Sequence, residues 1–575
     1  MEDNVEKNIN GQHNAVRNPR LKKELRLRDL YFAALTGVVG SGWIYGSYYT
    51  AGVVGPASIL SWVIGGIFIL VIALTWADVS SSYPLSGAGA RYIKFSHGSW
   101  ANAMTGWSAI LPAIATPAIE SIAIVGVIQA AFSSTAYKVV FVNPSGLPTV
   151  LGSVFAILIA LLFFYINYIG VRRVANVNSV VSVIKLPILI ILIVSLIVAG
   201  LAAGLGSNFS LPSFAPYGVS PIFTSIPATG IVFAYLGFRQ PIEMAGEAKN
   251  PKRDLPIAII LLVITVVFIY TLLQVSFIAG LHWNNAATGT LGVLPGQWFK
   301  LTTSLSTSAF PLFYETLGLG LTPIAVIVVI GGVIGPAADT SQYYASTARI
   351  LFGMSREGYF GNNSSIAKVE TKHHVPLVGL LITLAVTIAL IILGFAGYII
   401  SSVGGFWVAL TAIITTTLVF AYTSSSITLP IFRRFRREDD KSFKLKGYKI
   451  VAPIAFILSS LLVYWGAGSL ISSTDPYGGY VLVIIMIAGS FAYFTKAERK
   501  KEDIRSGLWM FVYLLSFLPL LYLGEYGTNL LKVPYDWMLV IVLAIIFFAW
   551  SQLSALPDSR IKEELLNAEE SLARE

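Results

Sequence analysis

The sequence predicts an all-α polytopic membrane protein with about 14 transmembrane helices. Of the 575 residues, 55% are hydrophobic and 12% are charged, whereas a soluble domain averages about 25% charged residues. The apolar residues lie in repeated stretches that are long enough to cross a bilayer as helices. The net charge of +10 comes from lysine and arginine gathered in alternate loops. This distribution indicates membrane topology and not nucleic-acid binding.

The first predicted span, residues 30–54, is interrupted by glycines. Gly37, Gly40, Gly42 and Gly46 fall within ten residues, and each would weaken an ordinary helix by about 1 kcal/mol relative to alanine. Irregular backbone inside a membrane is tolerated only where it is buried in protein or lines a cavity. The stretch therefore predicts a binding site whose opened N–H groups face an anion. Close helix packing through Gly42 and Gly46 is the alternative.

Four further spans complete the first half of the predicted membrane domain. Two of them carry buried charges, Glu120 in the third span and Lys185 in the fifth. Helices are expected at residues 56–79, 102–132, 151–169 and 179–201.

A second interrupted span lies at residues 221–245. Gly237, Arg239 and Pro241 fall within five residues there, and such a segment cannot continue one regular lipid-facing helix. A long polar loop at residues 282–315 includes a part that can form a short surface helix. The remaining spans are expected at residues 255–280, 318–345, 376–395, 406–427, 451–472, 481–494, 509–523 and 537–553.

The basic residues predict that both termini are cytoplasmic. With 14 spans, the two tails and the loops after even-numbered spans lie on one side of the membrane. Lys138, Lys300 and Lys532 lie on the other side, and Lys185 and Arg239 lie within spans, which leaves 34 of the 39 basic residues on the first side. The polar N-terminal residues do not resemble a secretory signal peptide, so the first span should act as its own insertion signal.

The two interrupted spans, the first and the sixth, occupy matching positions if spans 1–5 and 6–10 form two repeats. The sixth span then starts from the opposite side, so the repeats are inverted. Paired interrupted spans indicate the central site of a transporter. The predicted organisation is a basic cytoplasmic tail (1–28), a first five-helix repeat (29–202), a second repeat (221–430), four additional C-terminal helices (451–553) and a charged cytoplasmic tail (554–575).

Three stretches resemble the amino acid–polyamine–organocation superfamily of secondary transporters, which has the leucine-transporter fold. They are the glycine-rich break at residues 40–44, residues 233–238 with the Lys-Asn-Pro-Lys-Arg-Asp loop inside 247–256, and residues 348–358. The resemblance covers residues 28–430. It is to the proton-coupled amino acid permeases of the superfamily and extends to the aspartate–proton symporter branch.

The resemblance implies an amino acid held by its backbone between the two breaks. Its carboxylate would meet N–H groups near Ser41 and Gly42, and its ammonium would meet carbonyls around Phe233, Ala234 and Gly237. Elementary electrostatics agrees, because helix N-termini attract anions and unwound carbonyls attract cations. The predicted substrate-binding residues are Ser41, Gly42, Trp43, Phe233, Ala234, Tyr235, Gly237 and Arg239.

Arg239 departs from the commoner pattern of the family, which has an acidic residue after the Gly-Phe pair. A guanidinium offers a bidentate fork for a carboxylate. One interpretation is recognition of an acidic substrate side chain, aspartate or glutamate. The other is an internal ion pair that forms a gate, with Glu120, Glu243 or Glu247 as the partner.

Lys185 and Glu120 are the predicted proton-coupling residues. An unpaired ammonium in a dry interior is unfavourable by several kcal/mol, so Lys185 is suited to load and release a proton during transport. Proton-coupled relatives have a lysine in the matching part of helix five. The alternative is that Lys185 extends to the headgroups, although it lies about seven residues, or roughly 10 Å, into its span. Asp339 is a further buried carboxylate of the kind that marks a proton relay or an ion pair, although the simpler expectation is that it caps a break at Gly335-Pro336.

The predicted function is import of an amino acid across the plasma membrane by proton symport with alternating access. An amino acid or polyamine exchanger without net proton coupling is the alternative, and sodium is less expected than a proton. A channel would need a continuous polar stripe on several helices, and a sensor would need a sizeable soluble domain. Neither feature is apparent in the sequence.

The sequence does not predict an enzyme, because no nucleophile–base constellation stands out. Cysteine is absent, the histidines do not pair at metal-ligand spacing, and no Walker motif is present. No cofactor and no metal are expected. The expected partners are an amino acid, a proton and the lipid bilayer, and no nucleic acid.

Overall fold

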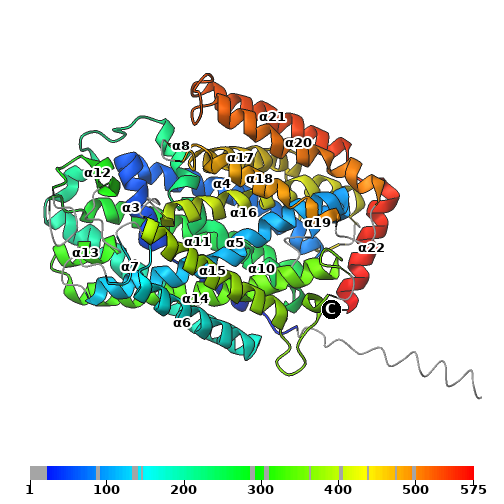
Figure 1. Ribbon diagram of the computed structural model, residues 1–575, viewed down its shortest axis with the longest axis horizontal. Coiled ribbons are helices and arrows are strands. Elements are labelled where there is room, and N and C mark those ends of the chain that lie inside the picture. Colours follow the sequence, from blue (N-terminus) through cyan, green and yellow to red (C-terminus); the bar gives the residue numbers. More distant parts are fainter. Residues whose placement is uncertain are drawn as a thin grey trace, which may run out of the picture.

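The computed structural model describes residues 23–85, 91–132, 140–143, 147–284, 292–303, 310–361, 364–400, 406–436, 440–472, 475–494 and 500–574. All named elements in these ranges are helices, and the β-bridges found there are two isolated pairs. Residues 1–22 of the predicted N-terminal tail lie outside the described residues, as does Lys138. The predicted all-α class is confirmed (Figure 1).

The first predicted span is two helices, α2 (Leu27–Thr36) and α3 (Gly42–Val54), with the glycine-rich residues 37–41 between them. The break therefore lies where the glycines predict it. The rest of the first half is η1 (Gly55–Ala57), α4 (Ser58–Ser82), α5 (Tyr92–Phe132), α6 (Val150–Tyr168), α7 (Val171–Ala202) and η3 (Leu205–Phe209).

The predicted sixth span is also broken. It consists of α8 (Ser220–Ala228), α9 (Ile231–Tyr235), η4 (Leu236–Arg239) and α10 (Gln240–Glu243), with Gly230 in the left-handed region at φ 91°. The second half continues with η5 (Ala245–Glu247), α11 (Pro251–Gly280), α12 (Trp298–Thr303), α13 (Pro311–Gly318), α14 (Thr322–Arg356), η6 (Ser365–Ala367), α15 (Leu377–Ile400) and α16 (Phe406–Phe435).

The C-terminal region adds a group of helices on one flank of the molecule, where α20 and α21 lie side by side (Figure 1). The predicted charged tail contains an amphipathic helix, α22, which buries Ile561, Leu565 and Ala568. The elements are α17 (Tyr448–Gly468), α18 (Gly478–Ala488), α19 (Phe491–Phe494), α20 (Lys501–Leu523), α21 (Tyr535–Leu553) and α22 (Asp558–Arg574).

By length and composition, the described residues hold 11 helices able to cross a membrane, or up to 12 if the bent pair Ser220–Ala228 and Ile231–Glu243 counts as one span. One of the eleven, Gly42–Ser82, runs from α3 through α4, and the apolar helix Gly478–Phe494 is shorter. The exact count of 14 therefore stays a prediction, whereas the polytopic membrane class is confirmed.

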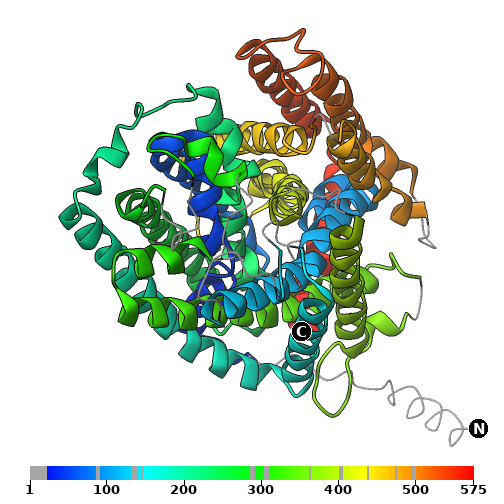
Figure 2. The same cartoon turned by 60° about the vertical axis from the view of Figure 1, so that its left-hand side comes forward.

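The outer helices expose apolar side chains, as helices that face lipid do. On α6, Leu158, Leu162 and Tyr165 are all more than half exposed. By contrast, 89% of the most apolar 18-residue stretch of α5 is buried inside the protein. Figure 2 shows α5 and α16 surrounded by other helices at the centre. These two central helices thus have mainly protein, and not lipid, as their environment.

The two ends of the molecule carry different loops. Figure 1 shows α12 and α13 at one end and α22 at the other. This agrees with the sequence, in which the loop after the seventh span and the C-terminal tail are expected on opposite sides of the membrane.

An ion-pair cluster closes the end of the molecule that carries α22. Glu357, just after α14, pairs with Arg91 at 2.8 Å and with Lys94. Burial works to raise the pKa of Glu357, but the two positive charges and their hydrogen bonds outweigh it and lower the pKa from 4.5 to about 2. Because the folded pKa is depressed, the stabilisation is present above about pH 4.5 and is lost as the pH falls towards 2.

We expect Glu357→Gln to lower the free energy of unfolding by about 3 kcal/mol near pH 7, because each pKa unit corresponds to about 1.4 kcal/mol. The difference from wild type should shrink as the pH falls below about 4.5. Thermal unfolding of both proteins in detergent, followed across this pH range, measures it. Glu563→Gln on α22, where the side chain is 62% exposed, is the control. A difference that does not change with pH would contradict the assignment.

Candidate functional site

The break between α2 and α3 leaves backbone carbonyls without helical partners, and side chains from two other helices satisfy them. Lys185 on α7 donates from Nζ to the carbonyls of Thr36 at 3.2 Å and Val39 at 2.9 Å. Tyr270 on α11 donates from its hydroxyl to the carbonyl of Val38 at 2.9 Å. A cation at the C-terminal end of α2 is also favoured by the helix dipole. Lys185 is 2% exposed, so it does not extend to the headgroups.

The first N–H groups of α3 face a carboxylate that belongs to the protein. Glu120 on α5 accepts hydrogen bonds from the Ser41 N–H at 2.8 and 3.1 Å and from the Ser41 hydroxyl at 2.8 Å. The side chain of Glu120 is fully buried. An anion at a helix N-terminus is the arrangement that the dipole favours. In this conformation, Glu120 accepts from the N–H of Ser41, one of the groups that the family resemblance assigns to a substrate carboxylate.

Asp339 on α14 completes this site, and the expectation that it caps a helix break is wrong. Helix α14 runs through Pro336 without interruption, and Thr340 satisfies the Pro336 carbonyl at 2.8 Å. The carboxyl group of Asp339 instead lies within hydrogen-bonding reach of Glu120. Two carboxyl groups can hydrogen-bond to each other only if one of them carries a proton.

Three titratable side chains therefore converge on one break. Lys185 interacts electrostatically with both Glu120 and Asp339. A Cβ atom built on Gly40 would lie 2.2 Å from Oδ2 of Asp339 and 2.8 Å from Oε1 of Glu120. Only a residue without a side chain lets both carboxyl groups approach the backbone here. We call Lys185, Glu120 and Asp339 the charge triad.

The second break lies directly against the first. A Cβ atom built on Gly237 would lie 1.9 Å from the carbonyl oxygen of Gly37, and one built on Gly42 would lie 2.8 Å from Cβ of Ala234. The fold thus brings together two stretches that are about 200 residues apart in sequence. Trp43 and Phe233 are buried beside this contact.

We expect Gly237→Ala to reduce transport to near background, because the added methyl group must push the two breaks apart. Overpacking of this kind destabilises a packed interior by about 1–3 kcal/mol. Uptake per amount of folded protein measures the effect. Gly206→Ala is the matched control, since the nearest atom to its new Cβ would be Cδ2 of Leu201 at 3.5 Å. Normal uptake by Gly237→Ala would show that the breaks do not need this contact.

Aromatic side chains support both breaks. Tyr422 on α16 donates to the carbonyl of Leu236 at 2.7 Å, and the Tyr235 hydroxyl donates to the carbonyl of Trp62 at 3.2 Å. Trp43 packs edge-to-face against Phe310, with ring centroids 5.8 Å apart. In this conformation Tyr235 and Trp43 therefore contribute packing, the commoner role of an aromatic residue in a span.

Arg239 forms an internal ion pair with one of the three carboxylates proposed from sequence. Its Nε lies 3.2 Å from Oε1 of Glu243, and both side chains are at most 5% exposed. Its guanidinium also lies over the ring of Tyr422, 5.8 Å from the centroid. Within the described part of the chain, Nη1 of Arg239 has no hydrogen-bond partner. The residue thus has a buried donor that remains available to a ligand.

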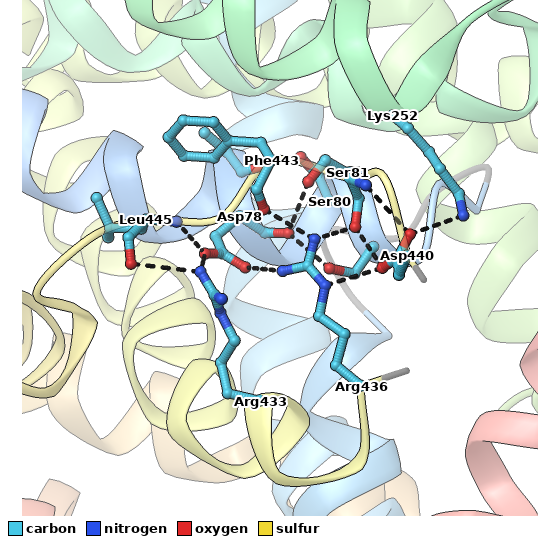
Figure 3. A network of polar contacts seen from close by, with 12 residues as sticks. Asp78, Ser80, Ser81, Lys252, Arg433, Arg436, Asp440, Phe443 and Leu445 are labelled. Carbon is cyan, nitrogen blue, oxygen red and sulfur yellow. Dashed lines mark hydrogen bonds and ion pairs between the residues drawn. The ribbon is translucent and has the colours of Figure 1, made fainter. Parts of the chain in front are cut away.

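Further charged contacts join the helices at the end that carries α22. Arg349 on α14 pairs with Glu247, just after the second break, at 2.9 Å. Figure 3 shows a second network, in which Arg433 and Arg436 at the end of α16 reach Asp78 on α4. Both networks connect a helix next to the breaks with a helix outside them.

Asp440 extends the second network to α11. It pairs with Arg436 at 2.8 Å and with Lys252 at 2.8 Å. Figure 3 shows Lys252 above Asp440 and Arg436 below it. Burial works to raise the pKa of Asp440, but hydrogen bonds from Lys252, Ser442 and Arg436 outweigh it and lower the pKa. Asp440 is therefore ionised at neutral pH and holds two cations together.

Sequence reasoning singled out Lys185, Glu120, Asp339 and both breaks, but it preferred a capping role for Asp339. It did not single out Tyr270 and Tyr422, which donate to carbonyls of the two breaks. A buried carboxylate in a span is itself a signal of function. The two tyrosines carry no such signal, because their partners are backbone carbonyls of distant segments.

The comparison with known proteins places these features in a family context. The amino acid permease family matches residues 25–470 of the chain. The glutamate/serine transporter AimA of Bacillus subtilis (strain 168) is 29% identical over 568 residues, covering 96% of this chain and 99% of that protein. The aspartate-proton symporter of the same organism is 27% identical over 545 residues, covering 94% and 98%. Its branched-chain amino acid permease BcaP is 25% identical, covering 77% and 88%.

Proposed function

Because the chain belongs to the amino acid permease family, we propose that it imports an amino acid by proton symport. The observation that carries the proposal is the charge triad at the first break, where Glu120, Asp339 and Lys185 meet the open ends of α2 and α3. Ionisable groups inside a membrane domain mark ion or proton pathways. The names of the two relatives that match nearly the whole chain, a glutamate/serine transporter and an aspartate-proton symporter, support this function.

The proposed substrate site lies between the two breaks. The substrate carboxylate binds N–H groups at the start of α3, near Ser41 and Gly42, after Glu120 has moved away. The ammonium group binds carbonyls around Phe233, Ala234 and Gly237. Trp43, Tyr235 and Arg239 border the same space. The contact between the two breaks supports this placement, since the opposed helix ends supply positive and negative partial charges within one small volume.

The proposed substrates include acidic amino acids. Arg239 is buried beside the second break and keeps one guanidinium nitrogen without a partner in the described residues. A guanidinium is suited to a second carboxylate, that of aspartate or glutamate. Glu243 pairs with Nε of the same guanidinium. Neutral substrates are the alternative, in which case the Arg239–Glu243 pair is a gate.

Proton coupling is proposed to operate through the triad. A protonated Lys185 holds the carbonyls of Thr36 and Val39 and so fixes the open end of α2. Transfer of its proton would weaken these contacts, because a neutral amine has fewer and weaker donors. A proton shared between Glu120 and Asp339 would link the same event to Ser41, whose N–H and hydroxyl donate to Glu120. Protonation thus controls the shape of the break that binds substrate.

Alternating access is proposed as a rocking of the helices that contain and flank the breaks (α2–α4 and α8–α11) against the rest. The pairs Arg349–Glu247 and Asp78–Arg433 join the two groups at one end, so they would have to separate when that end opens. We further propose that this end is cytoplasmic and that the protein resides in the plasma membrane, since 34 of the 39 basic residues are assigned to that side.

Uptake of radiolabelled amino acids into proteoliposomes, with an inward proton gradient and no sodium, tests the proposal. Accumulation of aspartate or glutamate that stops when an ionophore collapses the gradient is the expected result. Accumulation of neutral amino acids only would make Arg239 a gate and keep the coupling. Rapid exchange with preloaded substrate, without accumulation, would replace symport by exchange. Protein-free liposomes are the control.

A further inference from the structure

A basic cavity opens at the end of the molecule that carries α22. It has a volume of about 1180 Å³. Its walls come from Lys23 before α2, the end of α4, the residues around the start of α11, the end of α16 with the segment after it, and α22. Eight of its lining residues are lysine or arginine, and one, Asp440, is acidic. The topology rule explains why these residues lie on one side of the membrane. The rule does not explain why basic residues from four separate segments line one cavity.

Most of this positive charge is not balanced by the protein. Asp440 is already paired with Lys252 and Arg436. Within the part of the chain that the structure describes, no ion pair is formed by the other basic side chains at issue. These are Lys23, Lys249, Arg253, Arg434, Lys441 and Lys562. A cavity with this excess of positive charge attracts anions with several oxygen atoms, of which phosphate groups are the typical example.

An apolar groove continues from the cavity along the outer face of α11. It has a volume of about 470 Å³ and shares Lys252, Arg253 and Lys441 with the cavity. Its wall on α11 includes Leu261 and Ile264, which are 49% and 53% exposed. The two spaces together offer a phosphate-binding region next to a strip of apolar surface that faces the bilayer.

From this geometry we infer that the cavity and groove bind one anionic phospholipid, with the headgroup phosphate among the basic side chains and an acyl chain along α11. Basic pockets at the cytoplasmic ends of transmembrane helices suit anionic headgroups, and each lysine or arginine near such a surface strengthens binding by about fivefold. A soluble phosphate would use the basic cavity but would leave the apolar groove without a role. The lipid accounts for both features.

The full-length protein in mild detergent tests the inference by native mass spectrometry with phosphatidylglycerol and phosphatidylcholine of identical acyl chains. Wild type should retain phosphatidylglycerol preferentially. Arg253→Gln combined with Lys441→Gln should weaken this retention by about 30-fold, as expected for two lost contacts. The matched control is Lys368→Gln with Lys372→Gln, which removes the same charge from exposed residues outside the cavity. Equal retention of both lipids by wild type would overturn the inference.

Leu261→Trp separates a lipid from a soluble phosphate. The larger side chain fills the groove and leaves every basic residue in place, so it should weaken retention of phosphatidylglycerol. Glycerol phosphate is the competing probe. If it displaces the lipid from wild type at equal concentration, or if Leu261→Trp retains the lipid fully, the cavity binds a soluble phosphate and the lipid assignment is wrong. Lys249→Gln with Lys562→Gln, from other walls, provides a second charge variant if the first one does not fold.

Discussion

Replacing Lys185 by alanine is expected to abolish accumulation of substrate driven by a proton gradient, with a loss of at least about 100-fold. The change removes two charge-assisted hydrogen bonds to the break, each contributing about 1.5–3 kcal/mol, and leaves the carbonyls of Thr36 and Val39 without their donor. It also removes the cation beside Glu120 and Asp339. Uptake into proteoliposomes with and without the gradient measures the loss.

Lys185→Arg distinguishes coupling from a purely structural role. Arginine keeps the positive charge and the donors but does not release its proton in proteins. We therefore expect this variant to bind and exchange substrate and to fail in gradient-driven accumulation. Lys300→Ala is the control, because Lys300 is an exposed lysine on α12, at the end of the molecule away from α22. Full accumulation by Lys185→Arg would show that Lys185 supports the break without carrying the transported proton.

Replacing Arg239 by methionine is expected to destabilise the protein by about 3–5 kcal/mol, because the carboxylate of Glu243 then stays buried without its closest counter-charge. Adding Glu243→Gln should restore most of this stability, since neither side chain is then charged. Thermal unfolding of the two variants and wild type measures the rescue. A double variant as unstable as the single one would show that the ion pair is not what holds this segment.

The rescued double variant also tests the role of Arg239 in substrate selection. We expect its uptake of aspartate and glutamate to fall by about 10- to 100-fold relative to neutral amino acids, the range for one lost charge-assisted hydrogen bond. Neutral substrates report on the integrity of the site in the same protein. An unchanged preference for acidic substrates would leave Arg239 with a gating role and no substrate contact.

The helix breaks were predictable from sequence because their causes are local. The glycines from Gly37 to Gly42 weaken a helix, and the break lies at residues 37–41, while Gly237 with Pro241 interrupts another span. Their spacing in a chain of alternating spans then implies inverted repeats. The structure confirms both breaks and adds that they touch, which no local pattern can indicate.

Helix ends were less predictable than helix centres. The third span was expected to begin at residue 102, but α5 begins at Tyr92 and is kinked at Gly98, whose φ of 76° and ψ of −176° are not helical. The eighth was expected to end at residue 345, but α14 continues to Arg356. Both extensions contain charged residues, Lys94 and Arg349, that pair with other segments. A span predicted from hydropathy stops short of such charged residues, because the hydropathy of a residue does not include the partner that stabilises its charge in the fold.

By itself, the sequence determined the membrane class, the two broken spans, the family resemblance and the presence of Lys185 and Glu120 inside spans. These follow from composition, from backbone propensities and from the high energy of a charge in a membrane. Only the tertiary structure decided which charges meet. Asp339 lies beside Glu120 and does not cap a helix end. Of the three carboxylates considered from sequence, Glu243 is the one that pairs with Arg239. A buried charge is stable only with a partner. Which partner it meets depends on how the helices pack, and that packing depends on the whole chain.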